Sequence, residues 1–364
     1  MMMRQVRTDV LMVGYFPARG AIAELFGTIA AGLAGQVDVG VLAPDHLDPI
    51  AGAAADLRFS YSTSRPAGAM IGRGWRAHRA AAATRPTVTL LFTQHPLNAF
   101  AIGHLRRSEL AFWWHEPIPR GQAGAMRRWV YGTHDRLVVP RCGRIVVAGE
   151  SVLSSVPDEF RSRTKVVPFP LPTGVETPSD RFAGTPSDLV FFGKLEPYKG
   201  LDTLAEALTI LDQRGRHPTL RVIGSGDVDA AAPRLVEFAG RHPGRIDFVQ
   251  EYAPAADVAA GLHASKICVL PYHTAAGSSA IAITGSNRTP LVASDAGSFG
   301  DYLEDGRTAR LVAPGDPGAL ADALEGLLAS PDEGRRLGDA LYGLQAERFS
   351  IAATSDMLRT ALLG

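Results

Sequence analysis

Short apolar runs alternate with longer stretches of helical periodicity along the chain. Apolar runs of about four to eight residues that end at glycine, proline or polar residues predict strands covered on both faces. In the first half we predict strands at 9–16, 37–42, 87–92, 110–114, 144–147 and 165–167, and helices at 21–33 and near 72–79. In the second half we predict strands at 189–192, 219–223, 246–249, 267–270 and 291–294, and helices at 201–213, 233–239, 257–263, 319–329 and from about 351.

The order of these elements indicates the fold class. Strands that alternate with helices imply a parallel, doubly wound α/β sheet. Residues 168–187 are dense in proline, glycine and polar residues, which is typical of a linker, and the alternation restarts after them. A chain of 364 residues is also longer than one core usually supports. We therefore predict two Rossmann-like domains, at 1–170 and 188–345, joined by a linker at 171–187 and facing a central cleft.

The stretch at 188–202 combines a buried strand, a glycine turn and two lysines. Gly193 ends the strand at 189–192, and Lys194 and Lys199 lead into a helix that begins near Gly200. Backbone N–H groups at a helix start carry partial positive charge, so lysines added there suit an anion such as a diphosphate. The plain alternative is that both lysines are solvated surface residues.

Two further loops follow predicted strands. His115 comes directly after the strand at 110–114, and open α/β sheets bind ligands at the carboxyl ends of their strands. The alternative is a packed or solvated histidine. The loop at 272–280 consists mostly of small residues, whose backbone N–H groups can approach a phosphate or sugar closely. Its candidate residues are Gly277, Ser278 and Ser279, although loops of this composition also occur as plain connections.

A nicotinamide-binding loop is a weaker interpretation. Such a loop needs the pattern G-x-G-x-x-G directly after a strand. The nearest candidate starts at Gly224, Ser225 and Gly226, after the strand at 219–223, but Asp229 occupies the third glycine position. A dehydrogenase is therefore disfavoured.

Charge is distributed unevenly, although the formal net charge is zero. Residues 1–170 hold 20 Lys and Arg against 12 Asp and Glu, whereas residues 171–364 hold 17 against 25. This favours an acidic partner for the first half, either a phosphorylated acceptor or an anionic membrane surface. The leading patch is Arg73, Trp75, Arg76 and Arg79, because an aromatic residue lies among the cations. A solvated arginine face is the alternative.

Cysteine usage and hydropathy bear on the compartment. Hydrophobic residues make up 46% of the chain and charged residues 20%, as in ordinary globular proteins. Cys142 and Cys268 both lie in apolar runs, so we expect neither a disulfide framework nor a cysteine metal site. No apolar run suits a signal peptide or reaches the roughly 20 residues of a spanning helix. We expect a cytoplasmic protein, either soluble or peripheral on the inner face of the membrane, with no nucleic-acid partner.

Five segments of the second half resemble, in order and spacing, successive segments of family 4 retaining glycosyltransferases of the GT-B fold. They are GKLEPYKGLDTL at 193–204, RVIGSGD at 221–227, IDFVQEY at 246–252, CVLPY at 268–272 and PLVASDAG at 290–297. The resemblance is specific over about residues 188–330 and covers the first half only in outline. It implies an enzyme of carbohydrate biosynthesis that transfers a sugar, with retention of configuration, from a nucleotide sugar to an acceptor hydroxyl.

The resemblance also assigns parts to the two domains. The donor, a UDP- or GDP-sugar, would bind mainly to the second domain, and a sugar, lipid-linked or small-molecule acceptor mainly to the first. A closing helix at 346–364 would return to the first domain. Neither a metal nor another cofactor would be needed, because lysines and helix N-termini would serve as the counter-charge of the diphosphate.

Individual residues acquire roles from the same resemblance. Lys194 and Lys199 would hold the donor diphosphate and stabilise the charge that grows on the leaving nucleotide. Tyr252 lies where the family's backbone meets the nucleobase, and His115 matches a histidine that contacts the donor sugar near the reacting carbon. The other candidates are turn and loop residues that would lie beside the diphosphate, the sugar or the acceptor: Gly20, Gly193, Gly224, Ser225, Gly277, Ser278 and Ser279.

Two positions depart from the family pattern. The family commonly carries two glutamates across the small-residue loop and the helix after it, the first for the donor sugar and the second for the ribose hydroxyls. Ala275 and Ile283 occupy these positions here. A catalytically inactive relative that binds a nucleotide sugar or a partner protein is therefore an alternative.

Overall fold

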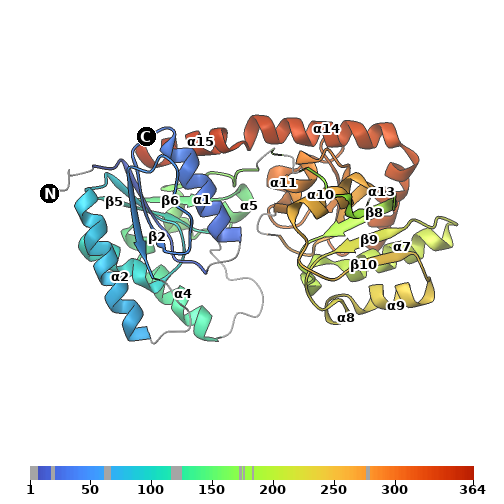
Figure 1. The fold of residues 1–364 in the computed structure, drawn as a ribbon, viewed down its shortest axis with the longest axis horizontal. Coiled ribbons are helices and arrows are strands. Elements are labelled where there is room, and N and C mark those ends of the chain that lie inside the picture. The colour runs from blue at the N-terminus through green and yellow to red at the C-terminus, as the bar shows by residue number, and fades with distance from the viewer. Residues whose placement is uncertain are drawn as a thin grey trace. The chain divides into compact units, whose positions relative to one another are not determined.

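The computed structural model describes residues 7–17, 21–60, 67–115, 125–171, 174, 177–182, 184–275 and 279–364. Contacts divide the chain into two compact units (Figure 1). Unit 1 comprises Met1–Pro170 and Ile351–Gly364, and unit 2 comprises Leu171–Ser350. Each unit is built around one parallel sheet with its own apolar core.

Unit 1 contains a seven-stranded sheet in the order β3-β2-β1-β4-β5-β6-β7. Residues of β1 alternate between its faces: Val10 and Met12 belong to one apolar cluster, and Leu11 and Val13 to another. Both faces are thus buried, as its continuous apolar run requires. The strands are β1 (Val10–Val13), β2 (Val39–Pro44), β3 (Ala55–Phe59), β4 (Val88–Leu91), β5 (Glu109–Trp113), β6 (Arg144–Val147) and β7 (Thr164–Val166).

Helices cover both faces of the unit 1 sheet. The C-terminal helix packs against the first helix, and their Leu358 and Phe26 join the cluster of Val10. Ala81 and Ala101, from the second and third helices, join the opposite cluster. The helices are α1 (Ala21–Ala34), α2 (Ala67–Ala81), α3 (Ala99–His104), α4 (Ala125–Leu137), α5 (Glu150–Leu153), α6 (Asp158–Arg161) and α15 (Ile351–Leu363), with short 3-10 turns that include η2 (Pro96–Asn98).

Unit 2 contains a six-stranded parallel sheet in the order β10-β9-β8-β11-β12-β13. The strands are β8 (Ser187–Phe192), β9 (Leu220–Ile223), β10 (Ile246–Val249), β11 (Ser265–Leu270), β12 (Leu291–Ser294) and β13 (Arg310–Val312). The helices are α7 (Leu201–Gln213), α8 (Val228–Ala231), α9 (Pro233–Arg241), α10 (Ala255–His263), α11 (Ser279–Ser286), α12 (Phe299–Tyr302), α13 (Pro317–Ala329) and α14 (Pro331–Arg348). Helix α7 packs against α9 and α13, and α11 packs against α14.

The prediction of two doubly wound α/β sheets is confirmed, but several elements were missed, among them helix α4 and the shorter helices α3, α5, α6, α8 and α12, as well as β3, β13 and α14. Strand β3 alternates apolar residues with Asp56 and Arg58 at the sheet edge, so it lacks a continuous apolar run. Strand β13 has only three residues. Helix α14 contains glycines that weaken a helical pattern, yet a Cβ at Gly338 would overlap the backbone oxygen of Arg288. Close packing therefore overrides helix propensity there.

The described part of the proline-rich segment at 171–187 packs on unit 2. Leu171 donates its N–H to the carbonyl oxygen of Phe349 at 2.7 Å. The hydroxyl of Ser179 donates to Asp257 at 2.7 Å, and Arg181 pairs with the same carboxylate at 3.0 Å. These contacts fasten the segment to the unit that follows it.

Candidate functional site

The strand order of unit 2 reverses at β8. Strand β9 lies on one side of β8 and β11 on the other, so the chain leaves β8 and β11 in opposite directions. Ligands of open α/β sheets bind outside the carboxyl ends of the strands at such a switch point. The loops that follow these two strands begin at Gly193 and Pro271, and the first of them carries Lys194 and Lys199.

Glycines bring the loops after β8 and β9 into backbone contact. Gly193 has a φ of 129°, which favours glycine. A Cβ at Gly224 would overlap the carbonyl oxygen of Gly193. The N–H of Leu195 donates to the carbonyl oxygen of Ser225 at 2.8 Å. The structure therefore brings together three of the predicted positions, Gly193, Gly224 and Ser225.

A second close approach joins the loops after β8 and β11. Gly200 has a φ of 72°, and a Cβ there would overlap the carbonyl oxygen of Pro271. The N–H of His273 donates to the carbonyl oxygen of Tyr198 at 2.8 Å. Gly200 is also the N-cap of α7 and supplies no side-chain cap. The partial positive charge of a 13-residue helix start thus lies at the switch point.

Lys199 places an unpaired cation at the same point. Its Nζ lies 3.8 Å from the ring centroid of Tyr272 and 5.0 Å from that of Tyr198. Within the described part of the chain, no hydrogen bond or ion pair reaches this atom. Burial lowers the pKa of Lys199 to about 8, and the carboxylate of Glu196 opposes this shift in part. A desolvated cation of this kind is stabilised by a bound anion.

Lys194 has a different environment. Its side chain is 69% exposed, and its Nζ pairs with the carboxylate of Glu196, which raises the pKa of Lys194. Exposed ion pairs contribute only about 0–1 kcal/mol to stability, so an incoming anion can exchange with Glu196. Glu196 could not be assigned a role from the sequence, because its pairing with Lys194 depends on the shape of the loop.

His273 is a second residue that sequence reasoning missed. Its Nε2 lies 2.9 Å from Oγ1 of Thr203 in α7, and the residue is exposed. When the Thr203 hydroxyl donates to Nε2, Nδ1 carries the hydrogen and can donate to a ligand. The available signal was position, because His273 follows β11 as His115 follows β5.

The other predicted donor residues lie in separate places. Tyr252 follows β10 and is 82% exposed. Ser279 is the first residue of α11 and is exposed. Gly20, Gly277 and Ser278 lie outside the described residues. No group of three or more His, Cys, Asp or Glu side chains in the described ranges is arranged to hold a metal ion.

Ala275 and Ile283, at the two glutamate positions, belong to packed structure. Ala275 is buried, and its carbonyl oxygen accepts the N–H of Ser298 at 3.0 Å. A Cβ at Gly297 would overlap the same oxygen. Ile283 packs against the core of unit 2. Neither side chain offers a polar group to a ligand.

His115 lies in unit 1 after β5. Its Nε2 donates to the carbonyl oxygen of Phe92 at 2.6 Å, and its ring stacks with those of Trp113 and Phe169 at centroid distances of 5.9 and 5.7 Å. Burial lowers the pKa of His115 to about 4, against the effect of the Phe92 bond, so the ring is neutral at pH 7. Its Nδ1 is buried without a partner among the described residues. Because Nε2 carries the hydrogen, Nδ1 is a hydrogen-bond acceptor.

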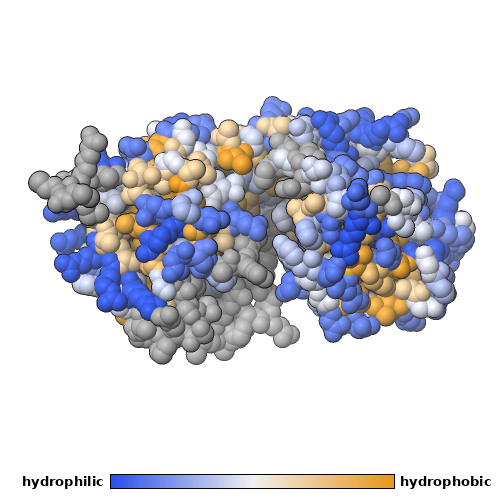
Figure 2. Space-filling view, in the orientation of Figure 1, coloured by the Kyte–Doolittle hydropathy of each residue, from blue (hydrophilic) through white to orange (hydrophobic). Residues whose placement is uncertain are grey.

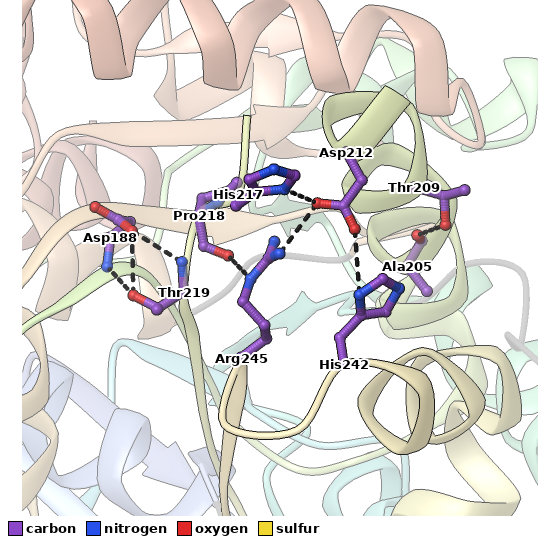
Figure 3. A network of polar contacts seen from close by, with 9 residues as sticks. All are labelled: Asp188, Ala205, Thr209, Asp212, His217, Pro218, Thr219, His242 and Arg245. Atoms are coloured by element: carbon purple, nitrogen blue, oxygen red, sulfur yellow. Dashed lines mark hydrogen bonds and ion pairs between the residues drawn. The ribbon is translucent and has the colours of Figure 1, made fainter. Parts of the chain in front are cut away.

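At the opposite edge of the unit 2 sheet, polar side chains bind one another (Figure 3). Asp212 accepts hydrogen bonds from His217 and Arg245 at 2.9 and 3.1 Å, and Arg245 also donates to the carbonyl oxygen of Pro218 at 3.0 Å. Burial opposes ionisation of Asp212, but these hydrogen bonds outweigh it and lower the pKa of the carboxyl. This network has a structural role, in contrast to Lys199, whose Nζ forms no ion pair with any residue that the structure describes.

Comparison with known proteins concerns mainly unit 2. Residues 186–330 match the family described as glycosyl transferases group 1. Alpha-D-kanosaminyltransferase of Streptomyces kanamyceticus is 26% identical over 174 residues, which are 47% of this chain and 44% of that protein. A D-inositol 3-phosphate glycosyltransferase of Corynebacterium efficiens is 32% identical over 176 residues, 47% of this chain and 41% of that protein. The match thus spans less than half the length of either relative.

Solved structures match over almost the whole chain. Anabaena HepE in complex with UDP and glucose has a TM-score of 0.73 at 13% identity, covering 97% of this chain and 99% of that one. The chain has the GT-B fold. Sucrose-phosphate synthase from Thermosynechococcus elongatus agrees, with a TM-score of 0.71 at 18% identity over 97% of this chain and 98% of that one. At these identities the likeness establishes the fold alone.

Proposed function

We propose that this protein is a glycosyltransferase that transfers a sugar from a nucleotide-sugar donor to an acceptor hydroxyl, with retention of configuration. The observation that carries the proposal is Lys199, a partly buried cation at the switch point of unit 2 that has no counter-ion among the described residues. The same unit contains the match to group 1 glycosyl transferases. The names of the relatives, a kanosaminyltransferase and an inositol phosphate glycosyltransferase, also support sugar transfer.

The proposed chemistry depends on charge that develops on the leaving nucleotide. As the bond between the sugar carbon and the diphosphate oxygen breaks, negative charge grows on the diphosphate. Lys199 and the first N–H groups of α7 stabilise this charge, and Lys194 exchanges Glu196 for a phosphate oxygen. These groups take the place of a divalent metal, so we propose a metal-independent reaction. The donor in this proposal is a UDP- or GDP-sugar.

Unit 1 has two roles in this proposal. It binds the acceptor, and Nδ1 of His115 accepts a hydrogen bond from a hydroxyl of the donor sugar. No described residue is a hydrogen-bond partner of the buried Nδ1, which supports this assignment, because a buried acceptor atom without a partner is costly unless a ligand completes it.

Donor turnover tests the proposal. Nucleotide release from UDP- and GDP-sugars should be about a hundred- to a thousandfold slower in Lys199→Ala, because loss of one positioned donor to a developing anion costs roughly 2.7–4 kcal/mol. Lys266→Ala is the matched control, since Lys266 pairs with Asp188 at the amino end of β8 in the same unit. Equal rates for the two variants would contradict the proposed site.

A relative that binds a nucleotide sugar without transferring it is the second candidate. The apolar residues Ala275 and Ile283 favour it, because neither can contact sugar or ribose hydroxyls through a polar side chain. Nucleotide binding to the wild type, with neither hydrolysis nor transfer of any donor sugar, would select this candidate over the enzyme.

We also propose that α2 contacts an anionic membrane surface. Trp75 is 40% exposed, and the guanidinium carbon of Arg79 lies 5.4 Å from its ring centroid. Figure 2 shows hydrophilic residues over α2 on the visible face. Along the described chain, no helix is long and apolar enough to cross a membrane. Co-sedimentation with anionic liposomes at low salt should occur and should weaken in Trp75→Ala, and absence of binding would refute the contact.

A further inference from the structure

The sheet of unit 1 has its own switch point. Strand β1 has β2 on one side and β4 on the other, so the order reverses between β1 and β4. Tyr15 follows β1 by two residues, and Thr93, Gln94 and His95 follow β4. The N–H of Tyr15 donates to Oγ1 of Thr93 at 3.0 Å, and the rings of Tyr15 and His95 stack with centroids 4.5 Å apart. This edge is where a doubly wound unit binds a ligand.

Helix α4 contributes a carboxylate to the same edge. Asp135 accepts two hydrogen bonds from Nε2 of Gln94, at 2.9 and 3.0 Å, and a third contact joins it to Nδ1 of His134 at 2.9 Å. The side chain of Asp135 is 22% exposed, whereas that of His134 is fully buried. Oε1 of Gln94 makes no hydrogen bond to the described residues. Two oxygen acceptors, from Asp135 and Gln94, therefore border the solvent here.

Buried residues next to Gln94 and Asp135 already connect α4 to the loop after β4. Asn98 donates to the carbonyl oxygen of Thr93 at 2.6 Å and lies 3.1 Å from Nε2 of His134, and both Asn98 and His134 are buried. These contacts hold α4 to the loop after β4. The partly exposed pair of Gln94 and Asp135 is not needed for that purpose.

His95 and Asp135, two titratable side chains at this edge, offer no positive charge to a phosphate. Burial lowers the pKa of His95 to about 4, with smaller effects from His134 and His78, so its ring carries no charge at pH 7. Asp135 adds a carboxylate.

We propose that unit 1 takes an uncharged, polyhydroxylated ring as acceptor, with its hydroxyl groups donating to Asp135 and Gln94. This deepens the proposed function and rests on it. Hydroxyl donors match an acceptor-rich edge. A phosphate group would bring a like charge to Asp135. In this proposal the acceptor is neutral, whereas net charge alone favoured an acidic one.

Paired acceptors test this proposal. Transfer from the preferred donor is measured to myo-inositol against inositol 3-phosphate, and to glucose against glucose 6-phosphate, each up to high millimolar concentration. We expect kcat/KM for the neutral member of a pair to exceed that for the phosphorylated member at least tenfold. Preference for the phosphorylated member would overturn the assignment. Donor hydrolysis with transfer to no member of either pair would also overturn it.

Substitutions of Asp135 and Gln94 test whether these two residues bind the acceptor. Asp135→Asn and Gln94→Leu should each raise the KM for the neutral acceptor about tenfold or more, because a charged or polar hydrogen-bond partner is lost, with a KM for the donor like that of the wild type. Asp158→Asn is the control, since Asp158 is 89% exposed in α6. Gln94→Leu keeps the test decisive if Asp135→Asn folds poorly. Unchanged acceptor KM in folded variants refutes the assignment, whereas absence of both nucleotide binding and donor hydrolysis in the wild type refutes the proposed function itself.

Discussion

Raising the pH from 7 to 9 should weaken binding of UDP or GDP about tenfold through Lys199 alone. The pKa of Lys199 is about 8 in the unliganded protein. A bound diphosphate favours the charged ammonium and raises that pKa toward or above the ordinary value of about 10.4. Between the two pKa values the complex holds one more proton than the free protein, so affinity falls as pH rises. With these values the loss between pH 7 and pH 9 is about tenfold, or about 1.4 kcal/mol.

Calorimetric titration can measure this linkage. Nucleotide is titrated at pH 7, 8 and 9 in buffers of different ionisation enthalpy, and the heats give the number of protons taken up. At pH 8 we expect about half a proton, because Lys199 is then half ionised. Lys199→Arg is the control, since a guanidinium stays charged over this range and any titration of the nucleobase is common to both proteins. The same pH dependence in wild type and Lys199→Arg would refute the reasoning.

Three further predictions concern particular contacts. His115→Phe keeps an aromatic ring in the stack but removes both nitrogens, so transfer should slow by about tenfold or more while the far-ultraviolet spectrum stays native, and an unchanged rate would remove His115 from the site. Gly224→Ala should lower the free energy of unfolding by about 1–3 kcal/mol, because its Cβ would overlap the backbone of Gly193. The control Gly240→Ala, in α9 with open space around it, should raise the free energy of unfolding by about 0.5–1 kcal/mol. Equal effects of the two substitutions in urea unfolding would contradict the packing argument. Asp212→Asn should cost about 1–3 kcal/mol at pH 7 and progressively less as pH falls below about 4, because the pKa of Asp212 is lowered in the folded protein and its contribution is lost as the carboxyl becomes protonated. A pH-independent cost would contradict this sign.

Most strands of the fold could be predicted from the sequence, because apolar runs and turn residues are local signals. Strands β8, β9 and β11 were predicted within one or two residues of their observed bounds. Strand β3 and helix α14 were missed for different reasons: β3 alternates polar residues at an edge, and α14 depends on contacts such as that between Gly338 and Arg288. Contacts between residues far apart in the sequence cannot be predicted from a local sequence pattern.

The candidate site shows the same division. Position after a strand was enough to select Lys194, Lys199 and His115 for attention. It was not enough to show that Lys194 pairs with Glu196 while Lys199 has no partner among the described residues, or that one nitrogen of His115 is bound to Phe92. These differences arise from loop shape and burial. The catalytic and binding roles of all three residues stay predictions.

Nucleotide affinity of Lys199→Ala, measured beside that of Lys266→Ala, tests most directly whether the donor diphosphate binds at the switch point of unit 2. Both variants lose one lysine from the same unit, at opposite edges of one sheet. We predict that UDP or GDP binds to Lys199→Ala at least tenfold more weakly than to the wild type, since a charge-assisted hydrogen bond is worth about 1.5–3 kcal/mol, and that Lys266→Ala stays within about twofold of the wild type. Equal affinities in all three proteins, or a larger loss of affinity in Lys266→Ala, would contradict binding of the donor diphosphate at this switch point.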